Sequence, residues 1–274
     1  METIDKKQLL DIAERFAVNI NKKNGEIDVL LGHDAHILAN YKRDNVKLIG
    51  GWYQNDVSLN VDFLVAVIKK YKITTMNFIG ASKSCSGSII LSKGIIRAKV
   101  KTPKMNLFMF SGYTTIDKDI YIKRNLIERT PASLMKLWDS EDYTEDLIKE
   151  MELRRLIGNK HIEIYLFYPT RSKYGEKVLA RRLIGNNIHH IGIPVYMHNT
   201  LYPMWKNVEE DRTIEIYENI VKKMHKDDHQ FYLAMQEHKS YNLHLYSILV
   251  DPVNFQKELA TFILDYKDKH DISY

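Results

Sequence analysis

The sequence predicts an α/β fold with a mostly parallel sheet of about six strands and helices on both faces. Short apolar runs alternate with segments of helical periodicity along most of the chain. The runs are mostly apolar and do not alternate strictly between apolar and polar residues, which is typical of parallel strands that are buried on both sides. No internal repeat or linker interrupts the 274 residues, so we expect a single domain covering residues 1–274.

The expected elements follow one another in a regular order. The apolar runs predict strands over residues 27–32, 46–51, 75–79, 106–110, 162–167 and 191–197. Apolar residues at helical spacing predict helices over residues 5–21, 61–70, 174–183, from the end of the third strand to about Leu91, and from Pro252 onward. Residues 117–158 are polar and helical in pattern, which predicts a helical cap between the fourth and fifth strands.

Composition limits the class of protein. The net charge of +5 is a mild excess, compatible with an anionic substrate or cofactor but not typical of nucleic-acid binding. As partner we expect a small-molecule or glycan substrate and no nucleic acid. One cysteine, Cys85, allows no internal disulfide, which suits a reducing compartment. The sequence shows neither a secretory signal nor an apolar run long enough to cross a membrane. We therefore expect a cytoplasmic protein without a membrane span; its oligomeric state is left open.

The stretch from Met76 to Ile90 carries the strongest functional signal. A β-type apolar run stops at Gly80, small or polar residues follow, and an apolar stretch restarts at helical spacing. A strand that turns sharply into a helix with a serine at the turn is the pattern of a nucleophile elbow, whose strained serine needs small neighbours two residues away. Gly80 and Ser84 are those neighbours, so Ser82 is the candidate nucleophile. The other interpretation is a tight strand-to-helix turn without a catalytic role.

The order of elements resembles that of α/β hydrolases. The elbow is similar in particular to the Gly-Ser-Ser-Lys-Gly-Gly-type elbow of bacterial capsule polysaccharide O-acetyltransferases and related capsule-biosynthesis proteins. The shared residues are Gly80, Ser82, Lys83 and a run of small residues through Gly87. The resemblance implies an α/β-hydrolase-like fold and an acyl-serine intermediate that carries acetyl from acetyl-coenzyme A to sugar hydroxyls.

The resemblance also implies where a base and an acid should lie. A serine hydroxyl needs a general base within hydrogen-bond reach, and the fold delivers its histidine after the last core strand, where His198 lies. His244 is an alternative because it precedes the last helix. The acid is expected after the fifth strand, where Glu176 is the nearest carboxylate, although it also suits the first turn of a helix. Asp117, after the fourth strand, is a second candidate for the acid.

Backbone N–H groups would form the oxyanion hole. Lys83, directly after the nucleophile, would donate one N–H, and Asp34, in the loop after the first strand, would donate the second. His33, Asp34 and His36 lie within one loop and have no partner elsewhere, so we expect no metal site. The sequence has no glycine-rich dinucleotide or phosphate-binding motif. We expect no tightly bound cofactor, with acetyl-coenzyme A as a possible co-substrate.

Three functions remain open on the sequence. The elbow favours serine-dependent O-acetyl transfer to a capsular polysaccharide or another sugar, with the basic residues of segment 93–104 free to meet coenzyme phosphates. A carboxylesterase or deacetylase would use the same nucleophile, base and oxyanion hole with water as the acceptor. Two departures from the family pattern favour a third function, a non-catalytic hydrolase-like module that binds a glycan or a protein. The loop after the fifth strand has no aspartate at the place expected for the acid, and Ser84 stands where the family elbow has glycine.

Overall fold

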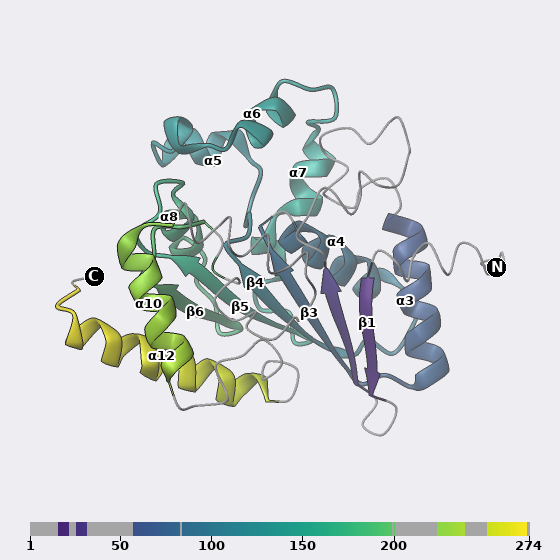
Figure 1. The fold of residues 1–274 in the computed structure, drawn as a ribbon. Coiled ribbons are helices and arrows are strands. Elements are labelled where there is room, and N and C mark those ends of the chain that lie inside the picture. Colours follow the sequence, from purple (N-terminus) through teal and green to yellow (C-terminus); the bar gives the residue numbers. More distant parts are fainter. Residues whose placement is uncertain are drawn as a thin grey trace.

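One six-stranded sheet organises the chain. The computed structural model describes residues 16–21, 26–31, 57–82, 84–198, 200, 224–238 and 251–272. Within these residues the strands lie in the order β1-β2-β3-β4-β5-β6, with β1 antiparallel to β2 and the other four neighbouring pairs parallel (Figure 1). The structure therefore confirms an α/β fold with a mostly parallel sheet.

Strands and helices alternate along the chain as the sequence patterns predict. The strands are β1 (Phe16–Asn21), β2 (Glu26–Leu31), β3 (Thr75–Ala81), β4 (Lys104–Phe110), β5 (Ile162–Pro169) and β6 (Ile188–Ile193). The helices of twelve residues or more are α3 (Val57–Tyr71), α4 (Ser84–Arg97), α10 (Lys226–Glu237) and α12 (Pro252–Lys269). Shorter helices are α5 (Lys118–Lys123), α6 (Ala132–Trp138), α7 (Glu145–Met151) and α8 (Glu176–Arg181), with 3-10 turns η2 (Ile127–Arg129) and η3 (Leu153–Leu156).

Two expected elements are wrong in place or type. The helix expected over 5–21 is a strand over residues 16–21, because β1 pairs with β2. The Asn-Gly pair between these strands, interpreted as a helix breaker, is also a strong hairpin signal. β6 starts at Ile188 and ends at Ile193, before Pro194, whose missing N–H prevents it from continuing the ladder. The strand expected over 46–51 lies outside the described residues.

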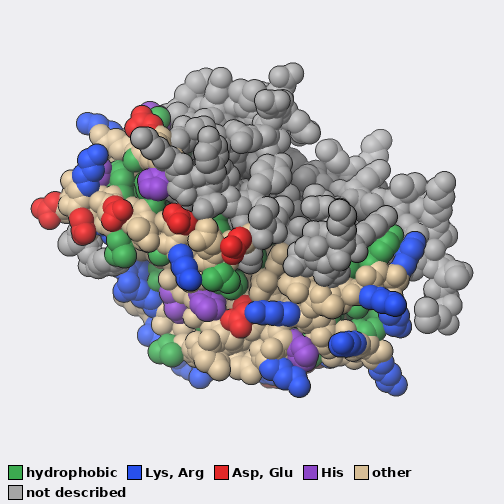
Figure 2. Space-filling model, turned by 90° about the horizontal axis from the view of Figure 1, so that it is seen from below, with side chains coloured by type: hydrophobic (Ala, Val, Ile, Leu, Met, Phe, Trp, Pro, Cys, Tyr) green, Lys and Arg blue, Asp and Glu red, His purple; other side chains and the backbone are tan. Residues whose placement is uncertain are grey.

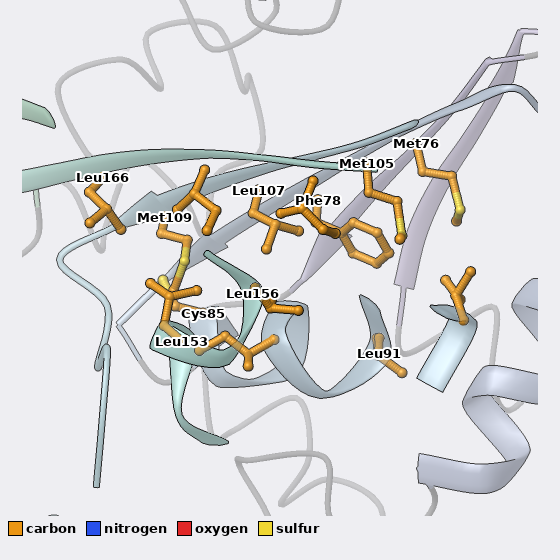
Figure 3. Packing of buried hydrophobic residues seen from close by; sticks show 14 of the residues in the cluster. Met76, Phe78, Cys85, Leu91, Met105, Leu107, Met109, Leu153, Leu156 and Leu166 are labelled. Atoms are coloured by element: carbon orange, nitrogen blue, oxygen red, sulfur yellow. The ribbon is translucent and has the colours of Figure 1, made fainter. Parts of the chain in front are cut away.

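The crossover segments pack on one face of the sheet. In Figure 3 the side chains of the sheet residues Met76, Phe78, Met105, Leu107, Met109 and Leu166 face Cys85, Leu91, Leu153 and Leu156 of α4 and η3. α3 and α8 contribute to the same buried cluster. Right-handed crossovers between strands that advance in one direction across a sheet all fall on one face, and the strand order here advances without reversal. This layer fixes the start of α4 against the end of β3.

The two C-terminal helices cover the opposite face. Phe231 of α10 and Phe255 of α12 are fully buried there against the aromatic residues of β4 and β5. Phe110 and Phe167 from those strands stack with their ring centroids 4.2 Å apart. Figure 1 shows α10 and α12 side by side next to β6. The expectation of helices on both faces is thus confirmed.

Between β4 and β5 the chain leaves the sheet and forms α5, η2, α6, α7 and η3. In Figure 1, α5 and α6 lie beyond the ends of the strands, at the top of the view. Buried residues of this segment, including Tyr121, Leu126 and Leu134, form a cluster with Ile90 of α4 and Leu179 of α8. The helical segment is therefore packed on the two helices that follow β3 and β5.

On the face drawn in Figure 2, Lys and Arg side chains are spread over the whole face, whereas Asp and Glu side chains lie on its left half. None of the described helices combines the length and apolar character that crossing a bilayer requires.

Candidate active site

Ser82 occupies the turn between β3 and α4. Its backbone φ of +53° lies in the left-handed region, which costs a non-glycine residue about 1–3 kcal/mol and is enriched at functional sites. The Ser82 N–H donates to the Phe110 carbonyl at 2.8 Å, and the Cys85 N–H donates to the Ser82 carbonyl at 3.2 Å. A Cβ at Gly80 would lie 3.0 Å from the backbone of Ser84 and Cys85. The small residue before the serine is therefore required by the close approach of the helix.

Three side chains from distant parts of the chain meet at this turn. The Nε2 atom of His198, in the loop after β6, lies 2.7 Å from Ser82 Oγ. The Nδ1 atom of the same ring lies 2.7 Å from Oε1 of Glu176, the first residue of α8. When Nδ1–H donates to the carboxylate, Nε2 has a free lone pair that accepts from the serine hydroxyl. This is the arrangement in which a carboxylate orients a histidine base and the histidine activates a serine.

Of the three hydrogen-bonded side chains, the carboxylate of Glu176 is better shielded from water than the imidazole of His198. Glu176 is 8% exposed, whereas the His198 side chain is 28% exposed. The second carboxylate oxygen of Glu176 is buried and has no hydrogen-bond partner among the described residues. The ring of Tyr174 meets the imidazole edge-on, with centroids 5.9 Å apart. The histidine is therefore partly exposed, whereas its carboxylate partner is buried.

The other nucleophilic side chains next to the turn are buried. Ser84, Ser86 and Ser88 lie inside the first turns of α4 with almost no exposed surface. Cys85 is fully buried, and burial raises the pKa of its thiol. A protonated, inaccessible thiol is a poor nucleophile. Among the described serine and cysteine side chains of residues 82–88, Ser82 alone is partly exposed.

The remaining predicted site residues lie elsewhere or are not described. Asp117, the second candidate for the acid, caps α5, where its carboxylate accepts from the Asp119 N–H at 3.0 Å. Lys83, Asp34 and His244 lie outside the described residues. Within the described ranges no three His, Cys, Asp or Glu side chains come together as metal ligands would.

The loop after β6 is held by residues that the sequence interpretation did not single out. The two carboxylate oxygens of Asp228 accept from the backbone N–H groups of Tyr196 and Met197, both at 2.8 Å. At the other end of the loop, the hydroxyls of Thr200 and Ser111 lie 2.9 Å apart. Contacts between residues so far apart leave no local pattern in the sequence. An aspartate in the first turn of a helix is also expected from the helix dipole alone.

A cleft of about 400 Å³ lies beside the site. Tyr174 lines it and also contacts His198 edge-on, so the cleft and the histidine share a wall. The other lining residues are polar or charged: Glu128, Arg129, Thr130, Ser172 and Lys173. A Cβ at Gly175, where φ is +78°, would lie 2.7 Å from the Leu126 side chain, so the helical segment and the loop before Glu176 touch directly.

Comparison with known proteins adds only distant structural similarity. No protein-family model and no curated protein sequence matches the chain. Among solved structures, the chain is similar to an esterase of Pyrococcus furiosus, with a TM-score of 0.32 and 13% sequence identity. The match covers 63% of this chain and 63% of that one, so it spans less than two thirds of either protein. At this level neither fold nor function carries over from that enzyme.

Proposed function

We propose that this protein is a serine acyl enzyme with Ser82 as nucleophile, His198 as general base and Glu176 as the orienting acid. The observation that carries the proposal is the hydrogen-bonded chain Ser82–His198–Glu176, in which both heavy-atom distances are 2.7 Å. The order of these residues along the sequence, serine then acid then histidine, is also that of elbow-type serine hydrolases. A module that only binds a glycan or a protein has no need for a strained serine aligned with a buried carboxylate.

The geometry supports a two-step reaction. As Ser82 Oγ attacks the carbonyl carbon of an ester, His198 Nε2 takes the hydroxyl proton, and the carbonyl electrons move to oxygen. The tetrahedral intermediate then collapses, the bond to the leaving alcohol breaks, and His198 gives its proton to that alcohol. Water or another hydroxyl releases the acyl group from Ser82 by the same steps in reverse order. Glu176 holds Nδ1–H throughout and stabilises the imidazolium.

The negative oxygen of the intermediate would lie near the start of α4. This helix has 14 residues and begins two residues after Ser82, so the positive end of its dipole lies next to the serine. Backbone N–H groups in this position stabilise an oxyanion. We propose the N–H of Lys83 as one donor and the loop of Asp34 as the source of the second.

The acceptor decides between hydrolysis and transfer. Water is the acceptor that we propose first, which makes the protein a carboxylesterase or deacetylase whose substrate enters through the cleft beside Tyr174. Its lining carries two basic side chains and one acidic side chain, which suits a polar ester. The second candidate is O-acetyl transfer from acetyl-coenzyme A to a sugar or capsular polysaccharide, which the elbow residues Gly80 to Gly87 favour.

The basic residues of segment 93–104 give no support for binding of the coenzyme phosphates. The Lys93 ammonium donates to three backbone carbonyl oxygens at the end of α7, at distances between 2.6 and 3.1 Å. Arg97 forms a bidentate pair with Glu150. The expectation that these side chains are free to meet phosphates is therefore wrong for Lys93 and Arg97. Lys104 begins β4, at the end of the sheet opposite Ser82.

A fluorophosphonate probe tests the proposal because it reacts covalently with activated serines. We expect one adduct, located on Ser82 by peptide mass spectrometry. Ser82→Ala should abolish labelling and His198→Ala should slow it at least about a thousandfold, as loss of a catalytic base does in comparable triads. His189→Ala is the matched control, because His189 also pairs with a glutamate but lies within β6. Absence of an adduct on Ser82 in the folded native protein would refute the assignment.

A second assay separates hydrolysis from transfer. Acetyl-coenzyme A is incubated with the protein, with and without a sugar acceptor, and release of free thiol is followed. Ester hydrolysis predicts turnover of simple acetyl esters and no thiol release that depends on the sugar. Thiol release that requires the sugar and is lost in Ser82→Ala would establish the transferase.

A further inference from the structure

Among the charged residues that the structure describes, Asp228 is the most deeply buried. It lies in the first turn of α10, and its exposed fraction is 0%. Burial raises the pKa of this carboxyl, and the N–H groups of Tyr196 and Met197 oppose that shift. A buried carboxylate is costly unless its oxygens are hydrogen-bonded. Here both oxygens are used, one on each of two consecutive backbone N–H groups.

The segment held by these two bonds leads directly to the imidazole. Tyr196 and Met197 immediately precede His198, so the backbone entering the histidine is fixed at two points. This stretch follows Pro194 and lies outside the strand ladder, so the ladder does not supply those bonds. The Asp228 carboxylate supplies the two acceptors that carbonyl oxygens of a neighbouring strand would supply in a sheet.

Contacts of the Tyr196 side chain also hold this segment. The Arg171 guanidinium lies 4.1 Å from the ring centroid of Tyr196 and pairs with Asp227 at 2.9 Å. The ring of His225, the N-cap of α10, lies 4.3 Å from the Tyr196 ring. The first turn of α10 and the loop after β5 therefore meet at residue 196.

We propose that Asp228 is a positioning residue whose carboxylate fixes the backbone of residues 196–197 and so holds the His198 imidazole in line between Ser82 and Glu176. The inference rests on the proposed serine chemistry. Both hydrogen bonds of the imidazole are 2.7 Å long, so a shift of the backbone that carries the ring away from this position lengthens at least one of them. A displacement of about 1 Å in a catalytic group, even when caused from a distance, lowers a rate about a hundredfold.

The test is a pair of variants in adjacent residues with the same chemical change. Asp228→Asn keeps one acceptor but turns an amide NH₂ toward the second backbone N–H. We expect it to lower the rate constant of Ser82 phosphonylation about a hundredfold. Asp227→Asn weakens the partly exposed pair with Arg171 and the 3.8 Å contact with His225. The side chains of these two residues reach the loop through the Tyr196 ring and leave both backbone hydrogen bonds intact, so the rate should change by no more than about fivefold.

A third variant separates positioning from loss of stability. Ile162→Ala destabilises the other buried cluster, at the start of β5 and at the end of the sheet opposite Ser82. At a temperature where it remains folded it should label at the native rate. The hydrogen-bonded Nδ1 proton of His198, observed by NMR, should shift in Asp228→Asn and remain in place in Ile162→Ala. If Asp228→Asn labels as fast as the native protein, or is slowed only as much as Ile162→Ala, the positioning role is overturned.

Two further outcomes remain distinguishable. If native Ser82 does not react, the serine chemistry itself fails, whereas a reactive native protein with an unaffected Asp228→Asn variant refutes positioning alone. If Asp228→Asn does not fold, hydrogen exchange of the native chain decides. The amides of Tyr196 and Met197 should be protected because their acceptor is buried; exchange as fast as in an exposed loop would contradict the proposal.

Discussion

Replacing Glu176 with glutamine probes the acid of the proposed triad while preserving its shape. Oε1 of Glu176 accepts from His198 Nδ1 at 2.7 Å, and a glutamine carbonyl oxygen can occupy the same position. The substitution therefore removes the negative charge and leaves one hydrogen bond in place. The residue is 8% exposed, so little water is available to replace the lost charge.

The size of the effect follows from electrostatics. In the transition state the imidazole carries a positive charge, and charges delocalised over a carboxylate and an imidazolium lie about 4 Å apart in effect. At that separation an effective dielectric constant of about 20 gives an attraction of about 4 kcal/mol. Because each 1.36 kcal/mol of barrier is about a tenfold change in rate, we expect Glu176→Gln to slow acylation of Ser82 about a thousandfold.

The assay is the rate of fluorophosphonate labelling, or of p-nitrophenyl ester hydrolysis where turnover is measurable. Glu163→Gln is the matched control, because Glu163 also pairs with a histidine, His189 at 3.0 Å, but on a partly exposed part of the sheet. We expect Glu163→Gln to react at close to the native rate. A Glu176→Gln variant that reacts as fast as Glu163→Gln, while His198→Ala is inactive, would refute the orienting role of Glu176.

Three further outcomes follow from the packing around the site. Cys85 should resist alkylation at pH 8 in the native protein and react after denaturation, because burial raises the pKa of its thiol; rapid native alkylation would contradict its burial. In chemical denaturation, Lys93→Met should lower the free energy of unfolding by about 2–3 kcal/mol, because three carbonyl oxygens lose a charged donor. The control Lys101→Met, at an exposed position, should change the free energy of unfolding by less than about 0.5 kcal/mol. Gly112→Ala should destabilise the protein by about 1–3 kcal/mol, because the added Cβ would lie 2.3 Å from the Cys85 side chain; unchanged thermal stability would show that α4 is free to shift.

The parts of the fold that the sequence predicted are those with a local cause. Residues 75–79, 106–110 and 162–167 are mostly apolar, and all three runs are central strands. The errors arise where two local signals compete. Residues 16–21 fit both a helical stripe and a strand, and pairing with β2, which no local pattern reveals, decides for the strand. Pro194 within a run of apolar residues similarly moved the end of β6.

In the candidate site, too, the sequence predicted what has a local cause and missed what depends on contacts between distant segments. Ser82 was predictable because Gly80 and the turn residues impose a local pattern, and the structure places the serine at a positive φ in that turn. Glu176 had weak support because a glutamate in the first turn of a helix has an ordinary explanation; its contact with His198 depends on how two loops approach each other. Asp228 and the Ser111–Thr200 contact had no sequence signal, since each joins segments that meet only in the folded protein.

Isolation of the acyl-enzyme tests the central claim most directly. The protein is mixed with an excess of an activated acetyl ester, quenched in acid within the first turnover, digested and mapped by mass spectrometry. We predict a single acetylated peptide with the acetyl group on Ser82, which accumulates in the native protein and is missing in Ser82→Ala and His198→Ala. Acetylation of lysines alone, with Ser82 unmodified in folded protein, would contradict the assignment of this site as a serine acyl enzyme.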